Sequence, residues 1–265
     1  MTSQAQPLPG SPAWWASRAP ELTRPHGRPQ TDVGRIVDTA LKLIDDMGIR
    51  ALTLRALAET LGSGTATPYR RFNSKDELLA LVAERILGEV RAAPEQLEGL
   101  PWREAVAAAA DAFHDTLRRH PNALPLLAAQ VPVGPNGLRA REWLGGLLLR
   151  HGFSVPLAAR AFTAIGHYVI GFAIRQHDLG TPSPEDQAAL REYYRSLDPA
   201  TYPATTASAD ELTSVPLHEE LWFGLGLLLD GLELAAREEP QGSMGPGRHP
   251  PVRVPRGMEK NEPAA

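Results

Sequence analysis

The chain has 265 residues, no cysteine and a formal net charge of −4 at pH 7. This length suffices for one large or two small domains with hydrophobic cores, and the lack of cysteine excludes a disulfide framework and a thiolate metal site. The negative charge argues against indiscriminate nucleic-acid binding by the whole molecule, although a local basic face remains possible.

The sequence gives no sign of secretion or membrane insertion. Prolines interrupt the N-terminal stretch MTSQAQPLPGSPAWWASRAP, which lacks the apolar run of a signal peptide. No stretch reaches the roughly 20 uninterrupted apolar residues that a membrane span needs. We therefore expect a soluble, cytoplasmic protein.

The two ends of the chain lack a periodic apolar pattern. Residues 1–30 are rich in Pro, Ser, Ala and Gln, and residues 239–265 are rich in Pro and Gly. We predict a disordered basic arm over 1–30 and a disordered tail over 239–265. Trp14 and Trp15 are unusual in such an arm, and two explanations stay open: they fold back onto the protein, or they dock a partner.

Helical patterns dominate between these ends, without the alternation typical of strands, so we predict an all-α fold. The first helix is expected over 31–47, where apolar residues form one stripe, and Gly48 ends it. The second is expected over 53–61, with Thr53 as N-cap and Gly62 as its end.

A basic stretch, TATPYRRFNSKDEL, follows at Thr65–Leu78. Proline is tolerated only in the first turn of a helix, so Pro68 places the N-cap at Thr65 and the helix at about 66–72. Ser74 then begins another helix, which runs to about residue 91. In its capping box, Glu77 would reach back to the Ser74 amide.

The rest of the chain predicts a larger helical region. We expect helices at about 102–119, 122–130, 136–151, 155–178, 185–197 and 216–237. The polar segment 198–215 is expected to be a mobile loop. The last helix is apolar on most sides between Leu221 and Leu234, and a partner subunit is the simplest way to cover it.

The helices at 53–61 and 66–72 have the form of a helix-turn-helix, which lays its second helix in the DNA major groove. Hydroxyl groups and arginine suit base edges and phosphates, and a basic arm can enter the minor groove. Phe72 would turn inward to the core. From the residues alone, a small surface helix with solvated arginines is an equal alternative. The residues expected to contact DNA are Arg28, Thr53, Arg55, Thr65, Ala66, Thr67, Tyr69, Arg70 and Lys75.

The run RIVDTALKLIDDMGIRALTLRALAETLG, followed by PYRRFNSKDELL, resembles the N-terminal DNA-binding domain of TetR-family transcriptional regulators. The runs RRHPNALPLLAAQVPVGPN, LRHGFSVPLAARAFTAIGHYVIGFAI and LWFGLGLLLDGLELAA resemble the C-terminal domain of the tetracycline-repressor branch. The resemblance implies a helix-turn-helix DNA-binding domain over 31–91 and an effector-binding and dimerisation domain over 92–238. It also implies an all-helical homodimer, whose interface is a four-helix bundle of 155–178 and 216–237 from both subunits. Glycines consistent with close helix approach there are Gly166, Gly171, Gly224, Gly226 and Gly231.

The chain departs from the family at the reading helix and at the effector site. Ser63–Gly64 replaces the usual valine–serine pair, and Pro68 replaces a leucine, so base specificity does not carry over. The positions that hold a magnesium–tetracycline chelate in the tetracycline repressors align with Arg91, Ala109, Leu127 and Arg175.

These side chains do not suit Mg²⁺, so we expect no tetracycline–Mg²⁺ inducer, no metal site and no cofactor. An anionic or carbonyl-rich effector is expected instead. Both arginines pointing to solvent is the alternative, and His167 is expected foremost as a core or interface histidine, then as a pocket contact. The candidate effector pocket is Arg91, Phe113, Leu127, Pro132, His167 and Arg175.

The sequence thus favours a ligand-responsive transcriptional regulator, most often a repressor in this family. It would bind a palindromic double-stranded DNA operator as a homodimer and be released by a small-molecule effector. The alternative is a helical ligand- or partner-binding module without specific DNA binding. No G-x-S-x-G, P-loop or dinucleotide motif occurs, so enzymatic activity is not expected.

Overall fold

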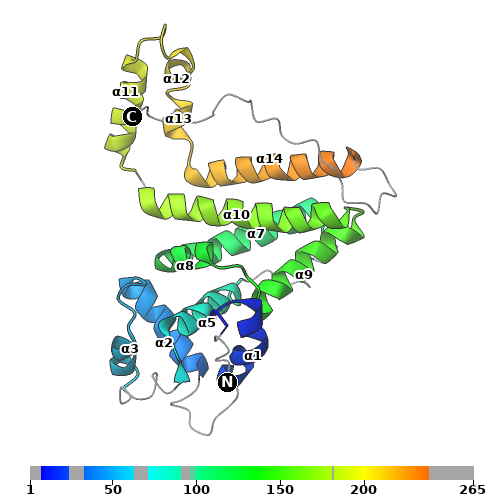
Figure 1. Cartoon of the computed structure of the whole chain (residues 1–265). Coiled ribbons are helices and arrows are strands. Elements are labelled where there is room, and N and C mark those ends of the chain that lie inside the picture. Colours follow the sequence, from blue (N-terminus) through cyan, green and yellow to red (C-terminus); the bar gives the residue numbers. More distant parts are fainter. Residues whose placement is uncertain are drawn as a thin grey trace, which may run out of the picture.

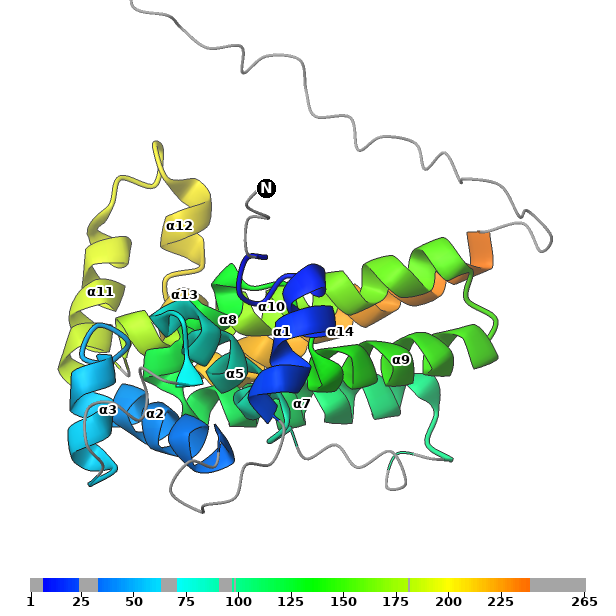
Figure 2. The same ribbon diagram turned by 60° about the horizontal axis from the view of Figure 1, so that its bottom comes forward.

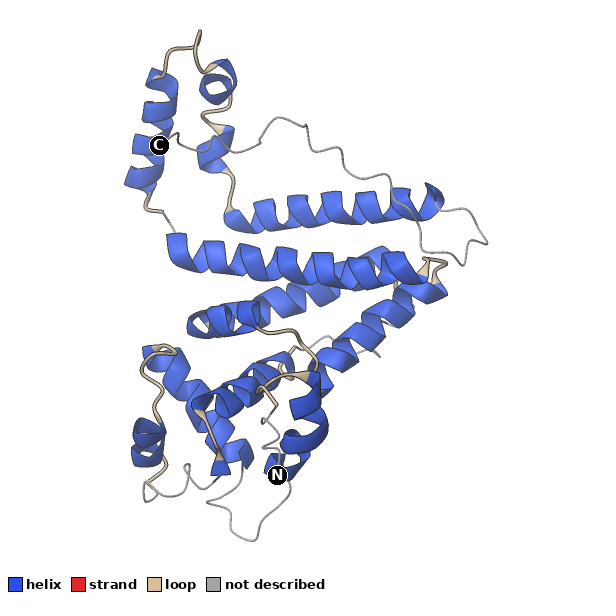
Figure 3. Ribbon diagram, viewed as in Figure 1, coloured by secondary structure: helices blue, strands red, loops and turns tan. Residues whose placement is uncertain are grey.

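The computed structural model describes residues 7–23, 33–62, 71–90, 97, 99–180 and 182–238. These residues form helices and no strand, and the predicted all-α fold is confirmed (Figure 3). The helices are α1 (Pro12–Thr23), α2 (Val33–Met47), α3 (Leu54–Thr60), α5 (Lys75–Leu87), α7 (Trp102–Arg119), η2 (Pro121–Ala123), α8 (Leu124–Ala129), α9 (Pro135–Arg150), α10 (Val155–Leu179), α11 (Pro184–Ser196), α12 (Pro203–Ala207), α13 (Glu211–Ser214) and α14 (Leu217–Glu238).

The helices form two groups, which meet at α5 (Figure 1). In the N-terminal group, α2 packs against α3 and α5, and their inward faces bury Ile36, Ile44, Leu57, Leu78 and Ile86. In the C-terminal group, α10 packs against α7, α8, α9 and α14. Because α5 also contacts α7, α8 and α9, it connects the two groups.

Local sequence signals set the ends of these helices. The Thr53 hydroxyl accepts the Ala56 amide at 3.0 Å, and the Ser74 hydroxyl accepts the Glu77 amide at 3.3 Å, so both predicted N-caps are confirmed. Gly48 follows α2 with φ +84°, a conformation that favours glycine.

Two details of the α5 prediction are wrong. The Glu77 carboxylate accepts the Asn73 amide at 2.9 Å, one residue before the expected Ser74 amide. The helix ends at Leu87, followed by Gly88 as C-cap, rather than near residue 91. Glycine lacks the side chain that would favour continuing the helix.

The expected disorder is wrong at two places. Pro12–Thr23 forms α1, with Trp14 buried, so this part of residues 1–30 is ordered. The segment 198–215 contains α12 and α13, which pack against α11. Arg195 Nη2 lies 2.7 Å from Asp210 Oδ1 and helps to hold α13 against α11, which projects beyond the body (Figure 2).

Helix α10 is long and apolar enough, by length and composition alone, to cross a membrane, although Arg160 and Arg175 interrupt it, so it is not an uninterrupted apolar run of the kind sought in the sequence. Core helices of soluble proteins pass the same test. Here one face of α10 packs in the C-terminal group and buries Ala158, Ala161, Ile165, Val169 and Ala173. This packing accounts for the buried face of α10, which makes up 33% of its apolar window.

Candidate effector cavity and nucleic-acid interface

The described part of the expected DNA-reading surface lies on α3 and at the start of α5. Thr53 and Arg55 are exposed, and Arg55 Nε lies 3.0 Å from Glu59 Oε1 on the same helix. Lys75 is half-buried, and its Nζ donates to the Ile49 carbonyl at 2.7 Å. An ammonium has three N–H donors, so this bond leaves capacity for a phosphate.

The predicted reading helix at 66–72 lies mainly outside the described residues. Phe72 is described and is buried among the residues of the core, as the sequence predicted. The expected contacts outside the described residues are Arg28, Thr65, Ala66, Thr67, Tyr69 and Arg70.

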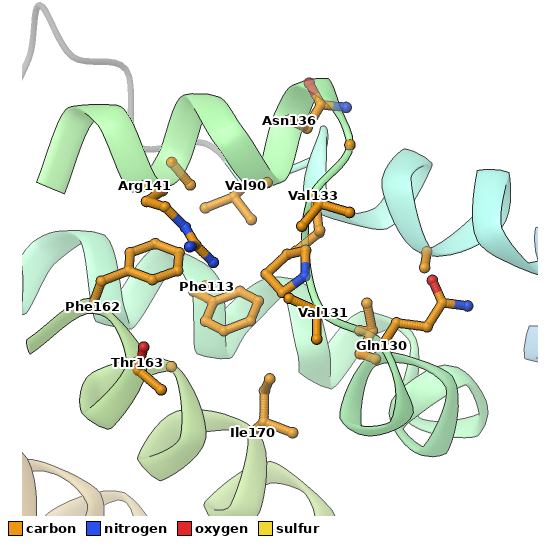
Figure 4. Close-up of a pocket in the computed structure, with 18 of the residues that line it drawn as sticks. Val90, Phe113, Gln130, Val131, Val133, Asn136, Arg141, Phe162, Thr163 and Ile170 are labelled. Atoms are coloured by element: carbon orange, nitrogen blue, oxygen red, sulfur yellow. The ribbon is translucent and has the colours of Figure 1, made fainter. Parts of the chain in front are cut away.

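A cavity of about 760 Å³ lies where the two helix groups meet (Figure 4). Its walls come from α1, α5, α7, α8, α9 and α10 and from the loop 130–134. The volume is typical of a site for a small organic molecule. The lining is mainly apolar and includes four aromatic rings, which belong to Trp15, Phe113, Trp143 and Phe162.

Two arginines from α9 give the cavity a positive side. The Arg141 guanidinium lies 5.0 Å from the centre of the Phe162 ring and reaches over it into the cavity (Figure 4). Arg139 Nη1 donates to Asn136 Oδ1 at 2.6 Å. Arginine N–H groups match carboxylates, phenolates and carbonyls, so these side chains suit a ligand with negative oxygens.

The cavity wall is also the junction between α5 and α9. The Glu84 carboxylate accepts a hydrogen bond from the backbone N–H of Asn136. The side-chain Nδ2 of Asn136 donates to the backbone carbonyl of Glu84 at 2.9 Å. Burial raises the pKa of Glu84, against the lowering effect of the Asn136 and Gly137 amides. A ligand beside Glu84 would touch the contact that sets α5 against α9.

The structure brings together four of the six expected pocket residues: Phe113, Leu127, Pro132 and His167 line the cavity. Arg175 is a correction, because it lies just beyond Ile174, the last lining residue of α10, and its side chain is exposed. Arg91 lies outside the described residues.

The His167 side chain is exposed in the single chain, so the core position expected for it is wrong, whereas the interface position expected with it stays a prediction. It lies on the cavity-lining face of α10, next to Gly166. The second expectation for His167, contact with the pocket, agrees with its place in the cavity lining.

Sequence reasoning missed Arg139, Arg141 and Glu84. Within a single sequence, charged residues on an amphipathic helix resemble ordinary solvated surface charge. Their approach to the cavity depends on how α5, α9 and α10 pack, which helical periodicity does not specify. In the part of the chain that is described, no three His, Cys, Asp or Glu side chains gather as a metal site would require.

A second junction, away from the cavity lining, links the two helix groups. His120, buried after α7, places Nδ1 2.9 Å from Asp45 Oδ2 on α2 and Nε2 3.0 Å from Glu89 Oε2 after α5. Burial raises the pKa of Asp45, against the opposing effect of His120. Burial would also raise the pKa of Glu89, but His120, Arg85 and Arg119 lower it.

Two family profiles match the chain. The profile described as "Bacterial regulatory proteins, tetR family" matches residues 36–82, and the profile described as "Tetracyclin repressor-like, C-terminal domain" matches residues 93–235. An HTH-type transcriptional regulator of Saccharopolyspora erythraea is 31% identical over 209 residues, covering 77% of this chain and 83% of that protein.

Two further similarities concern a repressor and a ligand complex. The HTH-type transcriptional repressor DrrR1 of Streptomyces coeruleorubidus is 31% identical over 217 residues, covering 78% of this chain and 79% of that protein. The ActR protein of Streptomyces coelicolor, in its crystal structure in complex with actinorhodin, is 29% identical in sequence to this chain. The two structures compare with a TM-score of 0.71, covering 81% of this chain and 100% of that chain.

Proposed function

Because the chain belongs to the TetR family of bacterial regulatory proteins and is a ligand-responsive transcriptional repressor, we propose that it binds a palindromic operator as a homodimer and leaves it when a small molecule fills the cavity. The observation that carries this mechanism is the shared wall of the cavity. Ala80, Glu84 and Leu87 of α5 face it from the DNA-binding side, whereas α7 to α10 enclose it from the other.

The shared wall is where a bound ligand would change the relative free energies of the DNA-bound and the released conformation. A ligand shifts an equilibrium only if it interacts differently with the two conformations. Helix α5 belongs to the N-terminal group, which carries the expected DNA contacts, and it also lines the cavity. A ligand in the cavity would therefore favour one position of α5 over another. Two reading helices at a changed separation would no longer match two half-sites of an operator.

The apolar surface of α14 supports the homodimer. Phe223, Leu227 and Leu234 repeat along one side of α14 and are 71%, 57% and 56% exposed. Exposed apolar side chains repeated along one helix favour an interaction site, and a two-fold axis would bring the same stripe of a second copy against it. The proposed interface is a four-helix bundle of α10 and α14 from both protomers.

The cavity chemistry supports a planar aromatic effector with a negative charge or several carbonyl oxygens. Aromatic side chains suit stacking or edge-to-face contact, and Arg139 and Arg141 suit the oxygens. ActR, to which this chain is similar, has been solved with actinorhodin. A tetracycline–Mg²⁺ chelate is not part of the proposal, and we place the protein in the cytoplasm with its DNA.

The proposed DNA contacts combine two groups of residues. Thr53, Arg55 and Lys75 lie in the N-terminal helix group, and among the described residues Lys75 donates one hydrogen bond, to the Ile49 carbonyl. The other proposed contacts, from the basic arm and the reading helix, are Arg28, Thr65, Ala66, Thr67, Tyr69 and Arg70.

Operator binding is tested with a duplex selected from random DNA by the wild-type protein. Fluorescence anisotropy would compare wild type with Arg70→Ala and Tyr69→Phe across salt concentrations. We expect Arg70→Ala to weaken operator binding about tenfold or more, and Tyr69→Phe to weaken it less, through loss of a hydroxyl contact. Wild-type affinity should fall steeply as salt rises.

The matched control is Arg150→Ala, which removes the same charge from the exposed end of α9 and should leave operator affinity unchanged. If the wild type binds no sequence specifically below about 100 mM salt, operator recognition is refuted. The helical ligand- or partner-binding module without DNA binding would then be the better description.

A further inference from the structure

Helix α1 lies outside both ranges that match the family, yet it is packed firmly onto the protein. It contacts α2 and lies beside α5 and the start of α9 (Figures 1 and 2). Trp14 is only 1% exposed. Trp14 is therefore part of the buried core, although it lies outside the two matched ranges.

Trp15 forms part of the cavity wall. Its side chain is half-buried and lines the cavity together with residues of α5 and α9. A Cβ on Gly134 would lie 2.8 Å from Trp15 Cζ2, so the indole depends on the missing side chain at that position. Gly134 has φ −76°, which any residue adopts, so space rather than backbone conformation requires glycine there.

The chain before α1 also follows the cavity. A Cβ on Gly10 would lie 3.6 Å from Ala80 Cβ and 3.6 Å from Gln130 Oε1, and both of these residues line the cavity. The N-terminal segment therefore lies along the cavity wall over more than one residue.

Trp14 connects this wall to the DNA-binding group. The Trp14 and Trp15 rings meet edge to face, 4.9 Å between centres. Trp14 Nε1 donates to Glu77 Oε1 at 3.2 Å, and Glu77 Oε2 accepts the Asn73 amide at 2.9 Å. Asn73 directly follows Phe72, at the end of the predicted reading helix.

Glu77 is only 4% exposed, so its hydrogen bonds are not exchanged readily for water. A displacement of Trp14 would require the carboxylate to reorganise next to the Asn73 amide. The contacts thus run without interruption from the cavity, through two tryptophans and one carboxylate, to the end of the predicted reading helix.

We propose that α1 completes the effector site: Trp15 contacts a planar aromatic anion, and Trp14 transmits cavity occupancy through Glu77 to the reading helix. This inference rests on the proposed function, because it assigns a role in that same effector site. A ligand that packs on Trp15 favours one position of α1 over another, and this difference is what couples two sites.

Ligand contact is tested on the full-length protein with anilinonaphthalene sulfonate, a fluorescent aromatic anion. Wild type, Trp15→Ala and Trp15→Phe would be titrated, with Ala109→Phe, which fills the cavity from α7, as the reference for lost cavity binding. We expect Trp15→Ala to weaken binding about tenfold and Trp15→Phe to restore most of it. Trp222→Phe on α14, away from the cavity lining, is the matched control and should bind like wild type.

Transmission is tested with Trp14→Phe, which keeps an aromatic ring but removes the N–H donor to Glu77. The operator dissociation constant is measured with and without saturating anilinonaphthalene sulfonate. We expect this variant to keep its affinity for the probe, whereas the ratio of the two constants falls toward one. Its thermal unfolding is recorded to verify that it is folded.

If Trp15→Ala binds the probe within twofold of wild type, α1 is not part of the site and the inference is overturned. If Trp14→Phe is released from DNA like wild type, transmission through Glu77 is overturned. If wild type binds the probe no better than Ala109→Phe, the proposed effector site itself fails. This last result is distinguishable from failure of the α1 inference alone.

Discussion

The two arginines of the cavity differ in what positions them. Arg139 is hydrogen-bonded to the Asn136 side chain, which also bonds α5. Arg141 lies over the Phe162 ring, which orients the guanidinium without occupying its N–H groups. We therefore assign recognition of a ligand's negative charge mainly to Arg141, and support of the α5–α9 junction to Arg139.

Substitution of Arg141 by Gln should separate charge recognition from apolar packing. We expect binding of anilinonaphthalene sulfonate to weaken about tenfold, because one charge-assisted hydrogen bond is lost. Binding of neutral phenylnaphthylamine should change little. Arg150→Gln on the same helix is the control, and equal losses for both probes would contradict charge recognition by Arg141.

The buried His114 makes the stability of the fold depend on pH. Its Nε2 lies 3.0 Å from Gln176 Oε1, and burial lowers its pKa below the ordinary value of 6.5. As pH falls through 6.5, the unfolded chain takes up a proton that the folded chain resists, so stability falls.

Urea unfolding of wild type and His114→Gln at several pH values from 7.5 downward would measure this effect. We expect wild type to lose more stability than the variant as the solution is acidified. Parallel stability curves for the two proteins would show that His114 does not contribute to the pH dependence.

Some of these side-chain features were predictable and others were not. Thr53 and Ser74 act on amides three residues away, so sequence spacing alone located both caps. Glu77 also acts locally, but its Oε2 accepts from the Asn73 amide rather than the Ser74 amide, and its Oε1 accepts from the distant Trp14 Nε1. The arginines at the cavity were missed because their role depends on tertiary packing rather than on spacing.

At the scale of helices, α10 and α14 approach closely at a glycine. Tyr168 Oη donates to the Leu221 carbonyl at 2.9 Å, and a Cβ on Gly224 would lie 2.8 Å from Tyr168 Cζ. Gly224 thus serves the packing of two helices within one chain. The proposed dimer contact is left to the exposed side of α14, where an added Cβ on Gly231 would have no neighbour within 4 Å.

Substitution of Gly224 by Ala should destabilise the chain by about 1–3 kcal/mol, because the added methyl group overpacks the contact with Tyr168. Gly145→Ala is the control, since a Cβ there meets nothing within 4 Å. It should be neutral or stabilise by up to about 1 kcal/mol through better helix propensity. Equal unfolding free energies for the two variants, measured in urea, would contradict close packing at Gly224.

Most helices were predictable, whereas α1, α12 and α13 were not. The 3.6-residue pattern indicated α2, α7, α10 and α14 within a few residues of their observed ends. Helices α12 and α13 have only five and four residues, so they depend on tertiary contacts such as Arg195 with Asp210. Helix α1 was missed because its stability comes from burying Trp14 rather than from its weak periodicity.

At the scale of the whole molecule, two junctions hold the DNA-binding group against the rest. Glu84 and Asn136 line the cavity, whereas His120, Asp45 and Glu89 are not among its lining residues. A ligand in the cavity would contact the first junction directly, and we propose that the second is the fixed point of the movement. The proposed movement of the reading helices is then a rotation of the DNA-binding group about His120.

Replacing His120 with Phe should loosen this fixed point. We expect a loss of about 1–3 kcal/mol in unfolding free energy, because two partly buried carboxylates lose their polar partner. Ligand-induced release from the operator should weaken as well. His151→Phe, at the exposed end of α9, is the control. A variant that keeps both wild-type stability and wild-type release would rule out the fixed point.

The central claim, a dimeric repressor released by a small molecule, is tested most directly by analytical ultracentrifugation with the selected operator duplex. Without ligand, we predict a complex of two protomers per duplex at low micromolar protein concentration. Saturating anilinonaphthalene sulfonate should separate dimer from DNA, while Ala109→Phe should stay bound. A protein that remains monomeric with the duplex, or a complex that the probe leaves intact although it occupies the cavity, would contradict the account.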